Sequence, residues 1–122
     1  MFYSLRKFEE AKVCYEKVIK FKSNNYEVYN KLGNIAHAQN RLFDAEIYYK
    51  KAIELRPDNA KALNNLGVIL KKLNKNDEAE KSYRNAIKIN PNYAATFINL
   101  ANIQYDKGDM LSSIKNFKKA LN

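Results

Sequence analysis

Hydrophobic and polar positions follow each other along the chain with the period of an α-helix. In residues 60–73 the apolar side chains stand three or four places apart, and the same spacing returns in residues 76–89. Such a pattern buries one stripe of each helix and leaves the other faces to solvent. We therefore predict a series of short amphipathic helices, at about residues 8–22, 26–39, 42–55, 60–73, 76–89, 94–107 and 110–121.

The whole pattern repeats every 34 residues. Residues 26–59 and 60–93 align without a gap and share 11 identities. A fixed period of this length indicates a repeat protein, in which each unit is a helix pair that stacks on its neighbours. We predict one repeat domain, with a partial repeat at 1–25 (mainly its second helix), full repeats at 26–59 and 60–93, and a repeat at 94–122 that is truncated at its C-terminal end.

Residue types that end or begin helices recur at the predicted turns with the same period of 34 residues. Residues that tolerate the left-handed conformation recur between the two helices of each repeat, and they are Asn40, Asn74 and Gly108. Pro57 and Pro91 stop the second helix, because proline cannot continue the helical hydrogen bonds. The polar residues after each proline can cap the next helix, and they are Asp58, Asn59 and Asn92.

Small and large side chains also recur in register. The small residues Gly33, Gly67 and Ala101 occupy one position in the first helix of successive repeats. We expect them to allow a close approach to the second helix, because little or no side chain separates the two backbones. Aromatic residues of the second helix are expected to fill the wider gaps, and they are Tyr15, Tyr49, Tyr83 and Phe117.

This arrangement resembles the tetratricopeptide repeat family from about residue 8 to the end of the chain. The family's pattern has Leu-Gly in the first helix, Ala, Tyr and Ala in the second, and Pro at the end. It is matched by Leu66, Gly67, Ala79, Tyr83, Ala86 and Pro91. The resemblance implies an all-α fold, a right-handed α-solenoid of antiparallel helix pairs whose first helices line a concave groove.

The resemblance also implies where a partner binds. Asparagine is frequent at the groove positions, and an amide side chain offers a donor and an acceptor to the backbone of an extended peptide. Asn65 and Asn99 resemble the asparagine ladder in the repeat arm of the O-linked N-acetylglucosamine transferase family. We predict a non-catalytic protein-interaction scaffold that binds an extended peptide or protein segment. Its predicted contacts are Lys31, Asn34, Lys61, Asn65, Lys72, Asn99, Asn102 and Tyr105.

Three other functions are alternatives to a peptide-binding scaffold. The chain is alternatively the substrate-recruiting arm of a larger enzyme such as a glycosyltransferase, whose catalytic domain would lie outside these 122 residues. An RNA-binding helical repeat is less favoured, because no run of Lys and Arg with stacking aromatic residues stands in the predicted groove. A clamp for a chaperone's C-terminal carboxylate is disfavoured. Asn34 and Asn65 match its two asparagines, but its three cationic positions hold Asn30, Ala95 and Asn99.

The charge of the chain narrows the class of partner. With 22 Lys+Arg against 13 Asp+Glu the net charge is +9, and the pI is about 9.6. The surplus forms no continuous basic stripe and is concentrated at Arg6, Lys7, Lys61, Lys71, Lys72, Lys115, Lys118 and Lys119. This distribution favours an acidic protein partner, or a codon bias with no partner behind it, over a nucleic-acid track. Because the chain begins and ends partway through a repeat, we also expect a fragment of a longer array that self-associates through its uncapped ends.

Candidate residues for catalysis or metal binding are lacking. His37 is the single histidine and suits the C-terminal end of a helix, and Cys14 is the single cysteine, expected as a small buried hydrophobe. We therefore expect no metal site, no catalytic site and no cofactor. No apolar run reaches the roughly 18 residues of a membrane span, and the charges after Leu5 argue against a signal peptide. We predict an intracellular, cytoplasmic protein.

Overall fold

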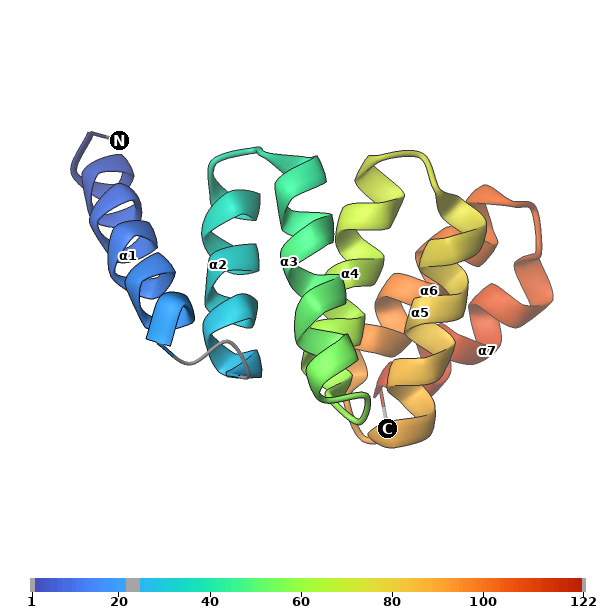
Figure 1. Ribbon diagram of the computed structural model, residues 1–122. Coiled ribbons are helices and arrows are strands. Elements are labelled where there is room, and N and C mark those ends of the chain that lie inside the picture. Colours follow the sequence, from blue (N-terminus) through green and yellow to red (C-terminus); the bar gives the residue numbers. More distant parts are fainter. Residues whose placement is uncertain (1, 22–24, 122) are drawn as a thin grey trace. The chain divides into compact units, whose positions relative to one another are not determined.

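The computed structural model describes residues 2–21 and 25–121, with the exception of the side chains at 2–6, 15 and 18–21. Within these residues the chain forms seven α-helices and no strand (Figure 1). They are α1 (Phe2–Phe21), α2 (Tyr26–Ala38), α3 (Leu42–Leu55), α4 (Ala60–Lys72), α5 (Asn76–Ile89), α6 (Ala94–Asp106) and α7 (Met110–Leu121). The predicted all-α class is therefore confirmed. No described helix is both long and apolar enough to cross a lipid bilayer.

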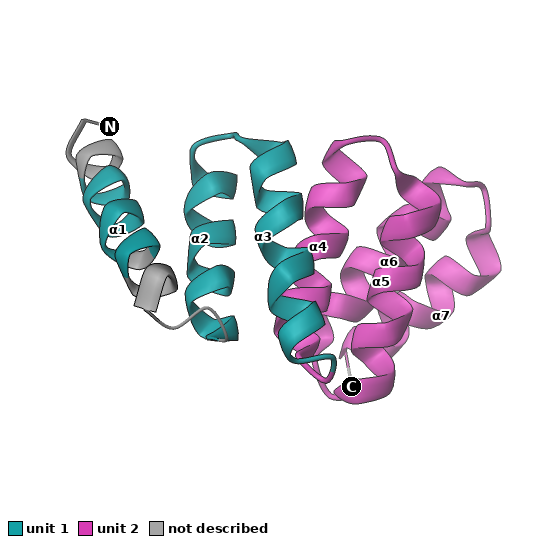
Figure 2. Ribbon diagram, in the orientation of Figure 1, with its two compact units in different colours: residues 1–57 teal, residues 58–122 magenta. Residues whose placement is uncertain are grey.

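Two compact units divide the helices between them (Figure 2). Unit 1, residues 1–57, holds α1 to α3, and α2 packs far more extensively against α3 than against α1. Unit 2, residues 58–122, holds the helix pairs α4 with α5 and α6 with α7, and α5 also packs against α6. Each pair is thus the basic packing element of the fold, as a helical repeat requires.

The first helix begins earlier than its pattern of apolar residues indicated. The predicted start was residue 8, whereas α1 begins at Phe2. Arg6 stands 34 residues before Asn40, where the later repeats have a residue that closes a helix. Arginine rarely adopts the left-handed conformation, so the helix continues through this position. The predicted aromatic position Tyr15, and the end of the predicted helix at residue 22, lie outside what the structure describes.

The turns between paired helices confirm the predicted closing residues. Asn40, Asn74 and Gly108 have φ angles of 60°, 63° and 87°, which places all three in the left-handed region. The amide that follows each one donates to a carbonyl five residues earlier, as Arg41 does to Ala36 at 2.8 Å. This is the hydrogen bond of a Schellman closure, and it satisfies a carbonyl that the helix end would otherwise leave without a partner.

The predicted N-terminal caps are partly right. Asn59 caps α4, since its Oδ1 accepts from the amide of Ala62 at 3.1 Å. Asn92 does not cap α6, whose N-cap is Tyr93 without a capping side chain. The repeat period explains the difference, because the position that corresponds to Asn59 is Tyr93 and not Asn92.

Packing within each helix pair centres on a glycine and a tyrosine. A Cβ atom added to Gly67 would lie 2.4 Å from the ring of Tyr83, and one added to Gly33 would lie 2.6 Å from the ring of Tyr49. Both tyrosines are only 1% exposed. The expected wide gap for the aromatic residue is therefore wrong: the ring lies directly over the glycine, where no side chain separates the helices.

The third repeat lacks this glycine. Ala101 replaces it and is fully buried, and the aromatic residue of that repeat, Phe117, is 36% exposed. Helix α5 packs against both α4 and α6, whereas α7 packs mainly against α6, so Phe117 is covered on fewer sides than Tyr83. In the two preceding repeats the small-and-large pattern in the sequence is a direct steric contact.

Burial also changes the chemistry of the two tyrosines. It raises the pKa of Tyr49 to about 12, and it raises the pKa of Tyr83 as well. The hydroxyl of Tyr49 donates to Oδ1 of Asn34 at 2.6 Å. Tyr49 is therefore a donor to the Asn34 amide at neutral pH, and the raised pKa extends this donor role to more alkaline pH than an exposed tyrosine would allow.

Candidate functional site

The first helices of the two repeats in unit 2 lie next to each other and present a joint surface, which we call the α4–α6 face. Its residues are Lys61, Asn65, Val68 and Lys72 from α4, and Ile98, Asn99, Asn102 and Tyr105 from α6, all at least partly exposed. Their spacing of three and four along each helix places them on one side of it. The structure therefore brings together six of the predicted site residues, Lys61, Asn65, Lys72, Asn99, Asn102 and Tyr105.

One hydrogen bond joins the two helices under this face. Nδ2 of Asn99 donates to Oδ1 of Asn64 at 3.1 Å, and Asn64 is only 5% exposed. The amide nitrogen of Asn99 therefore already has a partner inside the protein. Asn99 differs in this way from Asn102, because it holds α4 and α6 together as well as lining the face.

An ion pair joins the same helices near their C-terminal ends. Nζ of Lys71 lies 3.6 Å from Oδ2 of Asp106, and both side chains are partly exposed. An exposed pair of this kind contributes only about 0–1 kcal/mol to stability. Its larger effect is on the charge of the face, since Asp106 offsets Lys71 and reduces the basic segment that the sequence indicated at Lys71 and Lys72.

Apolar side chains are exposed on the α6 part of the face. Ile98 is 42% exposed and Tyr105 is 58% exposed, and they stand two helical turns apart on either side of Asn102. Sequence reasoning placed Ile98 and Tyr105 on the same concave face but selected only Tyr105 as a contact. The spacing of seven residues between Ile98 and Tyr105 indicates that both lie on one side of α6. The buried Phe97 and Leu100 lie on the other side.

The two remaining predicted residues belong to unit 1. Lys31 and Asn34 line a hollow of about 520 Å³ between α1 and α2, together with residues of α1 that include Phe8 and Cys14. The hydrogen bond from Tyr49 fixes Oδ1 of Asn34 at the side of this hollow. Lys31 is exposed at its rim.

The prediction for the single cysteine was wrong, and the predicted position of the single histidine was right. Cys14 is exposed, so the expected small buried hydrophobe is wrong. The reason is the sparse packing of α1 on α2, which leaves this side of α1 open to the hollow. His37 lies in the last turn of α2, as predicted. No group of three potential metal ligands occurs among the residues that the structure describes.

Comparison with protein families identifies the repeat. Three models of the tetratricopeptide repeat match residues 26–59, 60–93 and 94–122 in turn, and a TPR repeat model matches residues 1–40. Together the four matches span the whole chain. The sequence matches none of the curated proteins with which it was compared.

Solved structures share the fold at low sequence identity. Two crystal structures of MamA superpose with TM-scores of 0.89 and 0.86 at 24% identity, and a structure of MamA MSR-1 C2 superposes with 0.79 at 25% identity. Each match covers 93% of this chain and 67%, 62% and 66% of the other chain, respectively. The likeness establishes the helical repeat architecture.

Proposed function

The chain belongs to the tetratricopeptide repeat family, whose members bind proteins or peptides, and on this premise we propose that it binds an extended protein segment along the α4–α6 face. It has the fold of a protein-interaction scaffold. The proposed repeats are residues 26–59, 60–93 and 94–122, and residues 1–25 are proposed as a partial repeat. The role that we propose for the chain is non-catalytic.

The exposed apolar pair on α6 carries this proposal. Ile98 and Tyr105 offer apolar surface that water solvates poorly, and exposed aromatic residues of this kind often anchor a partner. Asn65 and Asn102 stand beside them and can bond to the backbone of an extended chain. Apolar anchors with amides between them suit a peptide better than a small polar ligand.

The cationic residues have a separate role in the proposal. Lys61 and Lys72 are exposed on α4, where they favour the approach of an acidic segment. In unit 1 the proposed contacts are Lys31 and Asn34, at the hollow between α1 and α2. Each unit thus has its own proposed contacts.

Replacing Ile98 and Tyr105 with serine tests the α4–α6 face. Short random peptides displayed on phage are first selected on the wild-type protein, and their affinities are measured by fluorescence anisotropy. We expect Ile98→Ser with Tyr105→Ser to weaken binding about tenfold or more, because anchors of this kind contribute more than about 1 kcal/mol each. The melting temperature should change little, since both side chains are exposed.

The matched control is Leu111→Ser, which removes an apolar side chain that is 84% exposed on α7, outside the face. It should leave the selected peptides bound as tightly as to the wild type. If the peptides bind the serine double variant with unchanged affinity, the face is not the binding surface and the proposal fails.

We also propose that α7 mediates self-association. Leu111 is 84% exposed and Ile114 is 52% exposed on neighbouring turns of this helix. One repeat earlier the corresponding residues are Asp77 and Glu80, so the repeat pattern itself does not require an apolar surface here. A second copy of the chain would remove this surface from water.

Light scattering over a concentration series tests the self-association. Leu111→Glu with Ile114→Glu should shift the average mass toward that of a monomer, because burying two carboxylates in an apolar contact is unfavourable. Phe43→Glu with Ile47→Glu is the control, since Phe43 and Ile47 are also apolar and are 68% and 65% exposed on α3. A wild-type protein that stays monomeric at the highest concentration would refute the proposal.

A further inference from the structure

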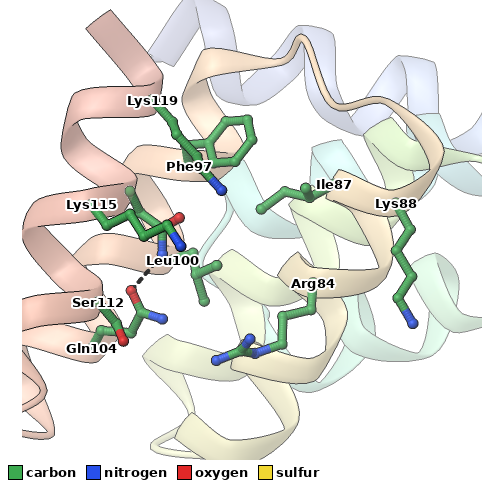
Figure 3. A pocket seen from close by; sticks show the side chains of 10 residues that line it. Arg84, Ile87, Lys88, Phe97, Leu100, Gln104, Ser112, Lys115 and Lys119 are labelled. Atoms are coloured by element: carbon green, nitrogen blue, oxygen red, sulfur yellow. Dashed lines mark hydrogen bonds between the residues drawn. The ribbon is translucent and has the colours of Figure 1, made fainter.

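A hollow of about 340 Å³ opens between α5 and α7, with α6 as its floor. Figure 3 shows its side chains: Arg84 reaches toward α7 from α5, and Lys115 and Lys119 stand on the other side. The floor is apolar and consists mainly of Phe97 and Leu100. On α6 these residues point away from the side that carries Ile98 and Tyr105, so the hollow is a surface separate from the α4–α6 face.

The charge of the hollow has one sign. Its lining contains the cationic residues Arg84, Lys88, Lys115 and Lys119 and no acidic residue. Among the described residues, Lys88 and Lys115 form no ion pair. Glu80 forms an ion pair with Arg84 at 3.2 Å and offsets part of its charge, so the surplus comes mainly from Lys88, Lys115 and Lys119. These cations concentrate positive potential over the concave apolar floor, because the low-dielectric wall screens them less than open water does.

This charge is particular to the last two repeats and does not come from the repeat architecture. The positions one repeat earlier that correspond to the seven charged or polar lining residues hold two lysines, two glutamates, an asparagine, a serine and a leucine, namely Lys50, Lys81, Glu54, Glu78, Asn85, Ser82 and Leu70. Their charges cancel. In the sequence, Lys88 stands where the preceding repeat has Glu54, Ser112 where it has Glu78, and Lys119 where it has Asn85, so these differences supply the positive charge of the hollow.

Two contacts hold the walls of the hollow in place. The amide of Asn116 donates to Oε1 of Gln104 at 2.6 Å, and both residues are buried. Arg84 bonds to Oε2 of Glu80 through Nε and Nη2 at 3.3 Å and 3.2 Å. Because a guanidinium has five N–H donors, this contact orients Arg84 and leaves other donors for a ligand.

The shape of the hollow indicates an elongated ligand. A neighbouring hollow of about 540 Å³ shares Ile87, Phe97 and Lys119 with it and extends to Pro91. Nucleic acid fits less well, since base stacking needs an open aromatic face and Phe97 is only 7% exposed. An extended peptide can place an apolar side chain on the floor and carboxylates against the rim.

We propose that this hollow is a second binding site, specific for an acidic peptide segment that carries an apolar anchor. Carboxylates of the segment pair with Arg84 and Lys115 from opposite walls, and the anchor lies against the partly exposed Ile87 and the edge of Phe97. Arg84 offers two parallel donors to a carboxylate, and Lys115 offers a point charge. Binding at this site does not depend on the α4–α6 face.

Charge reversal on both walls tests the site. The probe is a fluorescein-labelled synthetic peptide in which a leucine is flanked by aspartates and glutamates, and its isosteric form has asparagines and glutamines instead. At about 150 mM salt, where the Debye length is about 8 Å, we expect the acidic peptide to bind and the amide form not to bind. Arg84→Glu with Lys115→Glu should weaken the acidic peptide about tenfold or more in anisotropy titrations.

The matched control reverses the same charge on the same two helices. Lys81→Glu with Lys118→Glu changes two exposed lysines of α5 and α7 that do not line the hollow. It should retain most of the affinity, and Ile98→Ser with Tyr105→Ser should weaken the acidic peptide far less than Arg84→Glu with Lys115→Glu does. Circular dichroism and thermal melting establish that each variant is folded.

Several results would overturn the site. They are no binding of the acidic peptide, equal weakening by the two charge-reversed variants, or preferred binding of single-stranded RNA that Arg84→Glu with Lys115→Glu abolishes. A loss of the acidic peptide through Ile98→Ser with Tyr105→Ser alone would assign it to the α4–α6 face. That outcome would refute the second site and leave the proposed function intact.

Discussion

Gly67→Ala is expected to destabilise the protein, although alanine is the better helix former. By propensity alone the change would stabilise α4 by about 1 kcal/mol. The new Cβ, however, would lie 2.4 Å from the ring of Tyr83, which is buried and cannot swing into solvent. Overpacking of this kind costs about 1–3 kcal/mol, so we expect a net loss of up to about 2 kcal/mol and a melting temperature lower by up to roughly 8 °C.

A double-mutant cycle identifies the ring as the cause. Tyr83→Leu removes the ring, so the alanine should be far less harmful in that background than in the wild type. Gly33→Ala should reproduce the effect in unit 1, because its Cβ would lie 2.6 Å from the ring of Tyr49. A melting temperature of Gly67→Ala at or above that of the wild type would show that the helix pair opens freely, and the steric account would then be wrong.

Asn99→Ala is the second change with a large expected effect, and it acts on stability before it acts on binding. The substitution removes the donor to Oδ1 of Asn64, a side chain that is 5% exposed. A buried acceptor without its partner costs about 1–3 kcal/mol. Urea denaturation should therefore show a lower free energy of unfolding for this variant.

The neighbouring asparagine is the matched control. Asn102 is partly exposed one turn further along α6, so Asn102→Ala should change stability by less than about 0.5 kcal/mol. The variant that combines Asn64→Ala with Asn99→Ala should be less harmful than the sum of the two single changes, because no acceptor is then left without a donor. Equal unfolding free energies for Asn99→Ala and Asn102→Ala would rule out a structural role for the Asn99 bond.

The loss of stability in Asn99→Ala also affects the interpretation of its binding affinity. Asn99 was predicted as a contact of the same kind as Asn65, at the same position of successive repeats. A loss of partner binding in Asn99→Ala mixes a missing contact with a looser attachment of α6 to α4. Asn102→Ala and Tyr105→Ser change the face without that bond and are the cleaner probes of peptide binding.

The helix limits were predicted well where short-range features of the sequence determine them. The limits of α2 to α7 agree with the sequence pattern to within one residue, because apolar spacing and the closing residues Asn40, Asn74 and Gly108 act over a few positions. The start of α1 was predicted too late. No residue near Arg6 closes a helix, and a missing closing residue is harder to recognise in a sequence than one that is present. The cap at Asn92 was wrong because the closest polar residue was taken in place of the one in register.

The predicted site was only partly readable for a different reason. Repeat spacing predicted which residues share one side of α4 and one side of α6, and in the structure Asn65, Asn102 and Tyr105 are at least partly exposed on these neighbouring helices. It could not reveal that Asn99 is bonded to Asn64, 35 residues away. Nor did it show that Arg84 and Lys115, which lie in different repeats, line one hollow.

The sequence by itself determined the repeat length, the helix pairs, their turns and the family. These properties depend on periodic patterning and on single residues with strong backbone preferences, which act within one repeat. Only the tertiary structure decided which polar groups are used up in packing and which face solvent, as with Asn99 and Asn102. That decision depends on the stacking of one helix pair on the next, where atoms distant in the chain come within hydrogen-bonding reach and compete for the same partners.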